Sequence, residues 1–359
     1  MTDKYDIALV VGTRPNFVKA APLLNKLEEQ NKKVLFIHTG QHFDKNMSKN
    51  IFDDLSIRTP DINLNAPSDS QSKQFQYIVQ ELQKIFTNCE IDKVGVFGDV
   101  TSTLAASIAA KQSDLYLFHV ESGLRSNNLG MPEERNRIMV DAISDLLLIP
   151  SEDAKENLLK EKVSSDKIHN VGNIMIDTLA KNKSKIINNS EGIKNNLNIN
   201  KPYFVVTLHR PANLNDDILN NVFDAISNFT DNFQVILPAH PRLKNYIENN
   251  NIELSNVILI DPLPYIDFMS LVYGCDLVLT DSGGIQEETT YLSINCLTLR
   301  EETERPITVQ EGTNKVIGTN KENIINEINN VLGSKISNEA KIKYWDGETS
   351  DRIFQILFG

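Results

Sequence analysis

Ionisable side chains recur in this chain directly after short apolar runs, and glycines stand beside many of them. These places are residues 12–15, 39–42, 98–99, 121–123, 209–210, 240–242 and 281–284. Carboxylates, imidazoles and guanidinium groups there can move protons or bind anions. A single Asp at the end of a strand is more often a helix cap than a catalyst, so the hypothesis of a site depends on the whole set meeting in one place.

The carboxylates of Asp99, Glu121 and Glu133 are the candidates for acid and base chemistry. Asp99 and Glu121 end neighbouring predicted strands, and Glu133 begins a predicted helix. Two carboxylates that share a site shift each other's pKa values, as an acid/base pair requires. Glu133 could instead do no more than favour the N-terminus of its helix.

The turn of Ser282, Gly283 and Gly284 is the candidate for binding an anion. Glycines let a ligand approach free backbone N–H groups, and the dipole of the helix that follows favours negative charge. A plain serine cap would explain the same residues. Glu288 could bind hydroxyl groups of a ligand. Arg305 could supply a cation at the same edge, or it could pair with its acidic neighbours.

Several common catalytic motifs are missing from the sequence. No G-x-G-x-x-G follows a predicted strand, and there is no Walker A motif, no H-E-x-x-H and no G-x-S-x-G. A classical dinucleotide site, a P-loop, a zinc protease site and a serine hydrolase nucleophile are therefore not supported. We expect the protein to use neither a metal nor another cofactor.

The elements that must position these residues alternate along the chain. Apolar runs predict buried strands at residues 7–11, 34–38, 94–97, 115–120, 146–149, 168–171, 203–208, 234–238, 257–260, 277–280 and 296–299. Amphipathic segments predict helices at 15–30, 44–55, 72–86, 101–111, 132–144, 151–161, 216–229, 242–249, 265–273, 285–292 and 321–332. This alternation predicts an α/β protein with two doubly wound parallel-sheet domains facing a central cleft. Ligands of such sheets bind beyond the carboxyl ends of the strands.

The expected domain boundary is a polar segment. Residues 181–201 are rich in Asn, Lys and Ser, which suits a frayed helix end with a surface loop or an interdomain connection. We therefore expect domains at 1–180 and 201–349. The apolar residues within 350–359 predict a last helix that could pack back onto the first domain.

Composition narrows the classes of function. The 359 residues carry a formal net charge of −12, which argues against general nucleic-acid binding. No apolar run reaches the roughly 20 residues of a membrane helix, and residues 1–6 do not look like a signal peptide. Three scattered cysteines are too few for a disulfide framework. A cytoplasmic protein is expected.

Taken together, the motifs resemble the non-hydrolysing UDP-N-acetylglucosamine 2-epimerases over nearly the whole chain. The resemblance is carried by residues 12–15, 19, 98–99, 119–125, 132–134, 136–137, 172–173, 207–210, 281–288 and 304–306. It implies a GT-B-like fold with a UDP-sugar bound between two Rossmann-type domains, and a homodimer. Pro15 resembles the non-hydrolysing branch of the family.

The resemblance also implies roles for single residues. It implies catalytic roles for Asp99, Glu121, Glu133, His209 and Lys19. It implies substrate binding by Arg14, Ser282, Gly283, Gly284, Glu288 and Arg305. Two positions depart from the family pattern: Ser122 stands where Ala is frequent, and residues 211–213 keep the Asn of an Arg-Glu-Asn motif but lack its Glu.

The implied reaction is reversible inversion at C2 of UDP-N-acetylglucosamine, giving UDP-N-acetylmannosamine for surface polysaccharide. UDP leaves by anti-elimination, a carboxylate takes the C2 proton, and UDP adds back to the 2-acetamidoglucal after protonation of the opposite face. A modified sugar such as a UDP-diacetamido-uronic acid, a GT-B glycosyltransferase and a non-catalytic UDP-sugar binder are the alternatives.

Some relatives are activated by a second UDP-N-acetylglucosamine held near a Gln-His pair. This chain keeps Gln41 and His42 but has Asp44, whose charge would repel a diphosphate. Asp44 could also simply cap a helix. We expect activation to be weak or absent.

Overall fold

The computed structural model describes residues 3–40, 51–67, 69–210, 213–239, 241–250, 252, 257–332 and 340–359. The expectations about Gln41, His42, Asp44, residues 211–212 and His240 lie outside this part of the chain. The chain divides into two compact units. The first comprises Met1–Lys181 with Lys343–Gly359, and the second comprises Asn182–Ile342.

Among the described residues, the first unit holds a seven-stranded parallel sheet. Its strands, in spatial order, are β4 (Ile62–Asn63), β3 (Val34–His38), β2 (Ile7–Val11), β6 (Lys93–Phe97), β7 (Tyr116–Val120), β8 (Leu146–Ile149) and β9 (Ile168–Asn170). Two further strands, β1 (Lys4–Tyr5) and β5 (Glu90–Ile91), form a separate short parallel pair. All five residues of β2 are buried, because helices cover both faces of the sheet.

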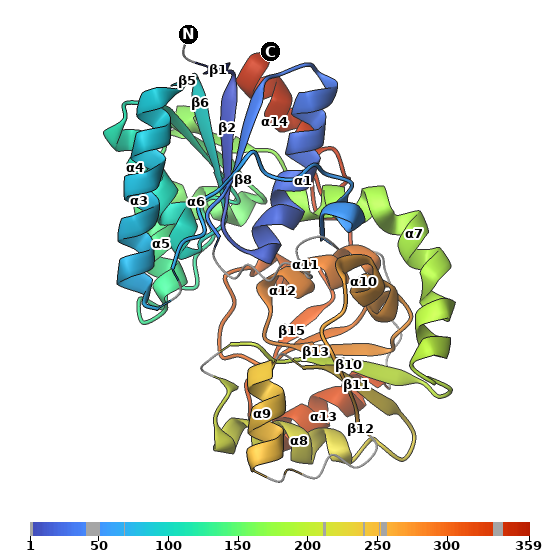
Figure 1. Cartoon of the computed structure of the whole chain (residues 1–359). Coiled ribbons are helices and arrows are strands. Elements are labelled where there is room, and N and C mark those ends of the chain that lie inside the picture. The colour runs from blue at the N-terminus through green and yellow to red at the C-terminus, as the bar shows by residue number, and fades with distance from the viewer. Residues whose placement is uncertain are drawn as a thin grey trace. The chain divides into compact units, whose positions relative to one another are not determined.

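Helices flank this sheet on two sides. They are α1 (Arg14–Glu29), α3 (Gln71–Asn88), α4 (Thr101–Gln112), α5 (Pro132–Ile143), α6 (Glu152–Lys160) and α14 (Thr349–Phe358). In Figure 1, α3 and α4 lie on one side of the strands, and α1 and α14 lie together on the other. The 3₁₀ turn η1 (Ser165–Lys167) precedes β9.

The second unit holds a six-stranded parallel sheet among its described residues. Its spatial order is β12 (Val257–Ile260), β11 (Gln234–Pro238), β10 (Tyr203–Thr207), β13 (Leu277–Thr280), β14 (Cys296–Thr298) and β15 (Asn314–Val316). Its helices are α8 (Asp216–Ser227), α9 (Pro241–Asn249), α10 (Tyr265–Tyr273), α11 (Gly283–Leu292), α12 (Ile307–Gln310) and α13 (Lys321–Leu332). Figure 1 shows α8, α9 and α13 on one face and α10, α11 and α12 on the other.

Both sheets have the strand order of the Rossmann fold. Numbered along the chain within each sheet, the order runs 3-2-1-4-5-6, with β9 added at the end of the first sheet. The order reverses between β2 and β6 in the first unit and between β10 and β13 in the second. Ligands of such sheets bind at this reversal, beyond the carboxyl ends of the strands. The predicted fold class, α/β with two doubly wound parallel sheets, is confirmed.

The structure corrects the expectation of a frayed end or loop at residues 181–201. Helix α7 (Ile174–Asn196) runs without a break through most of that segment. Asn182, Ile186, Ser190 and Ile193 are buried at intervals of three and four residues, so they form one face of a helix. The polar composition reflects the other, exposed face.

The C-terminal segment belongs to the first unit. The indole N–H of Trp345 donates to the carbonyl oxygen of Pro150 at 3.0 Å. The buried carboxylate of Asp177 accepts from the backbone N–H groups of Thr349 (3.0 Å) and Ser350 (2.7 Å) and so caps α14. The helix then packs along α1 (Figure 1). Helix α14 is therefore an integral part of the first unit.

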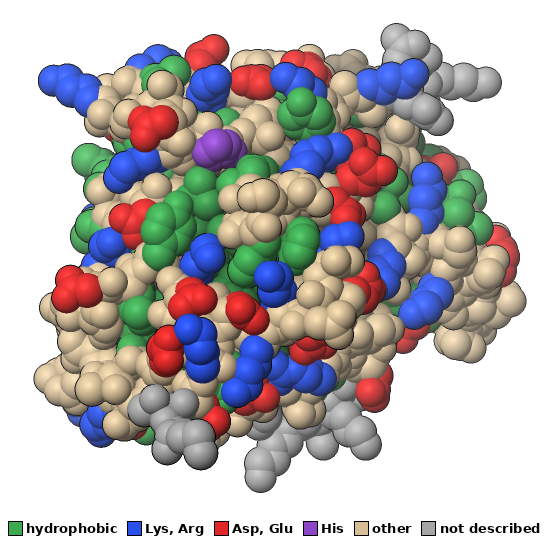
Figure 2. All heavy atoms as spheres, turned by 90° about the horizontal axis from the view of Figure 1, so that it is seen from above, with side chains coloured by type: hydrophobic (Ala, Val, Ile, Leu, Met, Phe, Trp, Pro, Cys, Tyr) green, Lys and Arg blue, Asp and Glu red, His purple; other side chains and the backbone are tan. Residues whose placement is uncertain are grey.

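No helix in the described part of the chain is both long enough and apolar enough to cross a lipid bilayer. Acidic and basic side chains are interspersed with apolar ones over the face shown in Figure 2.

Trp345→Ala should lower the free energy of unfolding of the first unit by about 3–5 kcal/mol, because it removes a buried indole and its hydrogen bond. Trp345→Phe should cost less, since it keeps most of the ring. Ile356→Ala, at a 37% exposed position of α14, is the control and should cost under about 0.5 kcal/mol. Urea denaturation monitored by circular dichroism measures the free energy of unfolding. Tryptophan fluorescence is unsuitable, because Trp345 is the single tryptophan and the variants remove it. Equal values for Trp345→Ala and the control would show that docking of this segment contributes no stability.

Candidate active site

Lys19 and Glu121 form a buried ion pair at the carboxyl edge of the first sheet. Lys19 lies in the second turn of α1, and Glu121 directly follows β7. Their charged groups are in contact, and the two side chains are only 8% and 7% exposed. Removing either partner of such a pair leaves an unpaired buried charge, which is strongly destabilising. The structure therefore brings together two of the residues that the sequence singled out.

The backbone around this pair is unusual. Glu121 has a φ of +70° and Gly98 a φ of +64°. A Cβ atom on Gly98 would lie 2.9 Å from Lys19 Nζ and 3.4 Å from Glu121 Oε2, so the glycine leaves room for the pair. A positive φ at a non-glycine residue costs on the order of 1–3 kcal/mol, and such residues cluster at functional sites. The carboxylate of Glu121 is held in place at a cost in stability.

Asp99 is fixed from α5 but remains accessible. Its carboxylate pairs with Arg137 (Nη2–Oδ2 2.7 Å), and Asn136 donates to its carbonyl oxygen at 2.8 Å. The side chain of Asp99 is 23% exposed, whereas that of Arg137 is 2% exposed. A buried guanidinium thus orients a carboxylate that solvent or a ligand can reach.

Glu133 and Glu134 have different roles although they are adjacent. Glu134 is buried, accepts from the backbone N–H groups of Ser126 (2.9 Å) and Asn127 (2.8 Å), and pairs with Arg137. Glu134 therefore holds the loop before α5. Glu133 is half-buried in the first turn of α5, with no hydrogen bond or ion pair among the described residues. Its carboxylate is available to a ligand, and it also suits the helix N-terminus.

His119 lies beneath these groups and holds the backbone of Gly98. It is fully buried, with Nδ1 2.7 Å from Asp141 Oδ1 and Nε2 2.8 Å from the carbonyl oxygen of Gly98. Burial alone would raise the pKa of Asp141, but hydrogen bonding and charge from His119 and Arg125 outweigh it, so this pKa is lowered. Asp141 is thus ionised. Both ring nitrogens of His119 thus face oxygen atoms, so the ring is fixed from both sides.

The sequence motif of residues 119–125 includes His119, but nothing in it pointed to Asp141. The signal that could have found the pair is a histidine inside an apolar strand, because a buried polar side chain needs a buried partner. The sequence does not say which residue that partner is.

Arg14 occupies the first position of α1, directly after the turn that follows β2. Burial lowers the pKa of its guanidinium, and the charge of Asp54 acts in the opposite direction. It belongs to the same carboxyl edge of the sheet as Lys19 and Gly98.

In the second unit, His209 is held by Asp281. Asp281 follows β13, is fully buried and lies 2.6 Å from His209 Nδ1. It also accepts from the backbone N–H of Arg210 (2.9 Å) and from the side chain of Asn213 (3.2 Å). Burial alone would raise the pKa of Asp281, but the interactions with His209 outweigh it and lower this pKa. The carboxylate therefore orients an imidazole that is 56% exposed. The sequence places Asp281 after a strand and within a family motif, but it does not predict the contact with His209.

The start of α11 is the candidate anion site of the second unit. Ser282 stands at the N-cap position, but its side chain makes no capping hydrogen bond, so the plain serine cap is not what the structure shows. Gly283 and Gly284 form the first turn. A Cβ atom on Gly283 would lie 2.2 Å from Arg305 Nη1, so the guanidinium packs directly against the helix start. The structure thus brings Arg305 to the glycine turn.

Arg305 pairs with two acidic residues. Its Nε lies 2.9 Å from Glu287 Oε1, and its Nη1 contacts Glu304. Glu304 also pairs with Arg300 (2.8 Å) and Arg210 (3.4 Å). Glu304 is therefore a shared partner of Arg210, Arg300 and Arg305. Guanidinium groups gathered in this way can bind an anionic ligand.

Glu288, on the same helix, is 3% exposed and accepts from the hydroxyl of Tyr265 at 2.9 Å. Burial raises the pKa of Tyr265 well above its usual value, so the phenol keeps its proton and donates. The acceptor oxygens of Glu288 are oriented by this bond.

Comparisons with known proteins show the family of this chain. The model of the UDP-N-acetylglucosamine 2-epimerase family matches residues 25–358. The chain belongs to this family. A UDP-N-acetylglucosamine 2-epimerase of Methanococcus maripaludis is 37% identical over 99% of both chains. A UDP-2,3-diacetamido-2,3-dideoxy-D-glucuronate 2-epimerase of Pseudomonas aeruginosa is 34% identical over 98% of this chain and 99% of its own.

Among solved structures, the UDP-GlcNAc 2-epimerase of Methanocaldococcus jannaschii in complex with UDP-GlcNAc and UDP is similar with a TM-score of 0.91. It is 36% identical, and the match covers 99% of each chain. The family expected from the motifs is confirmed, and the protein is an enzyme of the epimerase family.

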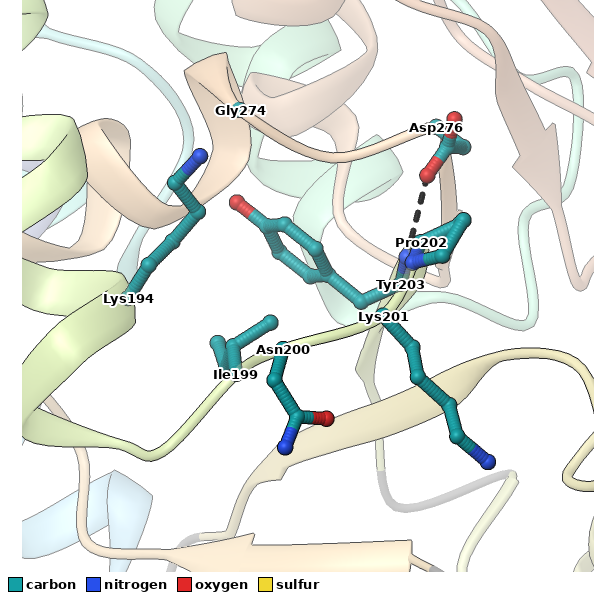
Figure 3. A pocket seen from close by; sticks show the side chains of 8 residues that line it. All are labelled: Lys194, Ile199, Asn200, Lys201, Pro202, Tyr203, Gly274 and Asp276. Atoms are coloured by element: carbon teal, nitrogen blue, oxygen red, sulfur yellow. Dashed lines mark hydrogen bonds between the residues drawn. The ribbon is translucent and has the colours of Figure 1, made fainter.

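A hollow elsewhere on the second unit is not part of the candidate epimerase site. It has a volume of about 430 Å³ and lies at the amino ends of β10 and β13, lined in part by Lys194, Lys201 and Asp276 (Figure 3). Asp276 accepts from the backbone N–H of Tyr203 at 2.9 Å, and the Tyr203 hydroxyl donates to Leu271 at 2.6 Å. The polar groups around Tyr203 therefore already bind one another. None of the predicted site residues lines this hollow.

Within the described residues, no group of three or more His, Cys, Asp or Glu side chains is arranged to hold a metal ion.

Gly98→Ala should reduce epimerase activity on the order of 100-fold, because a methyl group would push on the pair of Lys19 and Glu121. The positive φ should add about 1–2 kcal/mol of destabilisation. Gly192→Ala is the matched control: it lies in α7, its Cβ would meet only Asn189 Oδ1 at 3.4 Å, and it should keep full activity. Steady-state kinetics and thermal melting measure both. Full activity of Gly98→Ala would contradict the tight packing described here.

Proposed function

We propose that the protein interconverts UDP-N-acetylglucosamine and UDP-N-acetylmannosamine without hydrolysis. The observation that supports this most is the pairing of two chemistries in one chain. The first unit holds oriented carboxylates at its sheet edge, and the second holds a glycine helix start packed against Arg305. The UDP-GlcNAc and UDP bound in the M. jannaschii relative support the choice of substrate.

The reaction needs a strong leaving group before it needs a base. The C2–H bond has no neighbouring carbonyl, so its proton is not acidic in the ground state. When the C1–O bond breaks and its electron pair goes to the diphosphate, positive charge develops at C1 and the C2 proton becomes acidic. A carboxylate takes that proton, and C1=C2 forms in a 2-acetamidoglucal. Re-addition of UDP after protonation of the other face gives the epimer.

In this proposal, the second unit stabilises the leaving diphosphate. The N–H groups of Gly283 and Gly284, together with Arg305, would donate to oxygens whose charge grows as the C1–O bond breaks. Ser282 has a hydroxyl that its helix does not use, and Glu288 would bind the ribose hydroxyls.

The carboxylates proposed as acid and base come from the first unit. Asp99 and Glu121 are the first candidates for the two faces of C2, with Glu133 as a further acid/base or positioning group. Lys19 would hold the carboxylate of Glu121 in position through their ion pair. His209, oriented by Asp281, would add a proton donor near the diphosphate.

A modified UDP-sugar is the second candidate substrate. The P. aeruginosa relative is named for a diacetamido-glucuronate, and its match covers nearly the whole chain. The same elimination and re-addition would serve either sugar, because both carry a C2 proton and a UDP leaving group.

We further propose that the enzyme works in the cytoplasm as a homodimer and supplies a precursor of surface polysaccharide. Its three cysteines are free thiols, which suits a reducing compartment. The net charge of −12 supports a small-molecule substrate over nucleic acid. Light scattering of the purified protein measures the oligomeric state.

The deciding experiment is incubation with UDP-GlcNAc in D₂O. We expect deuterium at C2 and a mixture of the two epimers. Lack of exchange and product with UDP-GlcNAc, but exchange with UDP-diacetamido-glucuronate, would favour the second substrate.

Asp99→Asn and Glu121→Gln should each bind UDP but lose most of the exchange, because an amide keeps the shape and cannot act as a base.

Asp145→Asn is the matched control for the carboxylates. Asp145 also pairs with a cation, Lys111 at 2.8 Å, but precedes β8 at the amino edge of the same sheet. It should exchange deuterium at the rate of the unaltered enzyme. If Asp99→Asn or Glu121→Gln does so as well, that residue is structural.

Arg305→Ala should weaken UDP binding by about 10- to 100-fold, since a charge-assisted hydrogen bond contributes on the order of 1.5–3 kcal/mol. Lys315→Ala, which removes a surface ion pair with Glu327 in the same unit, should leave the affinity unchanged. Isothermal titration with UDP measures both. Unchanged affinity of Arg305→Ala would mean that this guanidinium serves only Glu287 and Glu304.

A further inference from the structure

The backbone on both sides of the Arg305 side chain is held by threonine hydroxyls. The N–H of Arg305 donates to Thr303 Oγ1 at 3.1 Å. The hydroxyl of Thr308 donates to the carbonyl oxygen of Arg305 at 2.8 Å, and the backbone N–H of Thr308 donates to the same oxygen at 3.1 Å. These bonds fix both peptide groups of Arg305 and therefore the direction in which its side chain leaves the backbone.

Two amide side chains connect these threonines. The hydroxyl of Thr303 donates to Gln286 Oε1 at 2.7 Å. Asn314 Nδ2 donates to the same Gln286 oxygen at 3.2 Å and to Thr308 Oγ1 at 3.1 Å. The two hydrogens of one amide group thus reach both arms of the network.

The network is buried and anchored in the sheet. Asn314 is 5% exposed, and Gln286 and Thr308 are fully buried. Asn314 begins β15, and its Oδ1 accepts from the hydroxyl of Thr298 on β14 at 2.6 Å. Buried hydrogen bonds of this kind are costly to break, so the position of Asn314 is well defined.

None of these side chains carries a charge, so the network acts on Arg305 through geometry. Arg305 packs tightly against Gly283, because a Cβ atom at that position would lie only 2.2 Å from Arg305 Nη1. A tilt of the Arg305 backbone would move the guanidinium into the helix start or away from it. Fork-shaped donors bind phosphate oxygens only in a narrow range of orientations.

We infer that Asn314 is a positioning residue for nucleotide binding. It holds Thr308 directly and Thr303 through Gln286, and thereby fixes the guanidinium of Arg305 where it meets the diphosphate of a nucleoside diphosphate. The inference deepens the proposed function and rests on the role given there to Arg305.

Substitutions of Asn314 separate shape from hydrogen bonding. Asn314→Leu keeps a similar volume without donors. Asn314→Asp keeps the shape but replaces the donor with an acceptor oxygen facing Gln286 Oε1 and Thr308 Oγ1. Neither atom can donate to it, because the hydroxyl hydrogen of Thr308 is already donated to Arg305. Both variants should bind UDP 5- to 10-fold more weakly than the unaltered chain. Thr308→Val, which removes the hydroxyl from the same chain of bonds, should have a similar effect.

Thr313→Val is the matched control. Thr313 precedes Asn314, and its hydroxyl donates to the carbonyl oxygen of Ile294 at 2.6 Å, outside the network. It should lose a comparable amount of thermal stability and keep its affinity for UDP. A loss of affinity in Thr313→Val equal to that of Asn314→Leu would show a general loosening of the strand and overturn the inference.

The deciding measurement is a double-mutant cycle of Asn314→Leu and Arg305→Ala, with UDP affinity by isothermal titration and folding by circular dichroism. If Asn314 acts through Arg305, Asn314→Leu should change the affinity less than twofold once Arg305 is absent. The same fold-loss in both backgrounds would overturn the inference while leaving the role of Arg305 intact. Unchanged affinity in Arg305→Ala alone would overturn the role of Arg305 itself. Should Asn314→Leu fail to fold, the cycle is run with Thr308→Val.

Discussion

Parallel pairing with one reversal of strand order is the constraint on which the candidate site depends. All carboxyl ends of a parallel sheet meet at one edge, and the two strands at the reversal send their following helices to opposite faces. In the second unit the register pairs Thr207 with Thr280. The residues that follow, His209 and Asp281, must then lie side by side. Their contact of 2.6 Å is a consequence of that register.

The charges gathered at these edges are costly to keep. Lys19 with Glu121 and Arg305 with Glu287 are nearly buried ion pairs, and well-packed apolar side chains of similar volume are often as stabilising or more so. Glu121 adds a positive φ to that cost. A chain selected only for stability would gain by losing these groups. Their presence at the carboxyl edges, where parallel sheets bind ligands, is the physical argument that they serve chemistry.

Much of the fold could be predicted from local pattern, and much of the pairing in the site could not. Apolar runs gave the buried strands, and the residues after them gave the site candidates, because both signals are contiguous in sequence. For Arg305, the sequence indicated an ion pair with adjacent acidic residues, and Glu304 does pair with it. Its second partner, Glu287, lies in α11, so nearness in sequence could not indicate it. The sequence did not predict β15, because a strand of three residues has too short a pattern. It did not predict α7, because the residues of its buried face stand among many Asn and Lys residues.

The ion pairs around Arg305 also bear on how tightly a leaving group would be held. Before a nucleotide binds, Glu287 and Glu304 already fix the guanidinium, so little side-chain ordering remains to be paid for on binding. If Arg305 binds the diphosphate as proposed, the same carboxylates would compete for the hydrogens of its guanidinium and moderate the affinity. In the proposed reaction UDP must separate from C1, remain in place while C2 is reprotonated, and then add back. A cation that is preorganised but shared favours that balance over the tight capture that would trap UDP as a product.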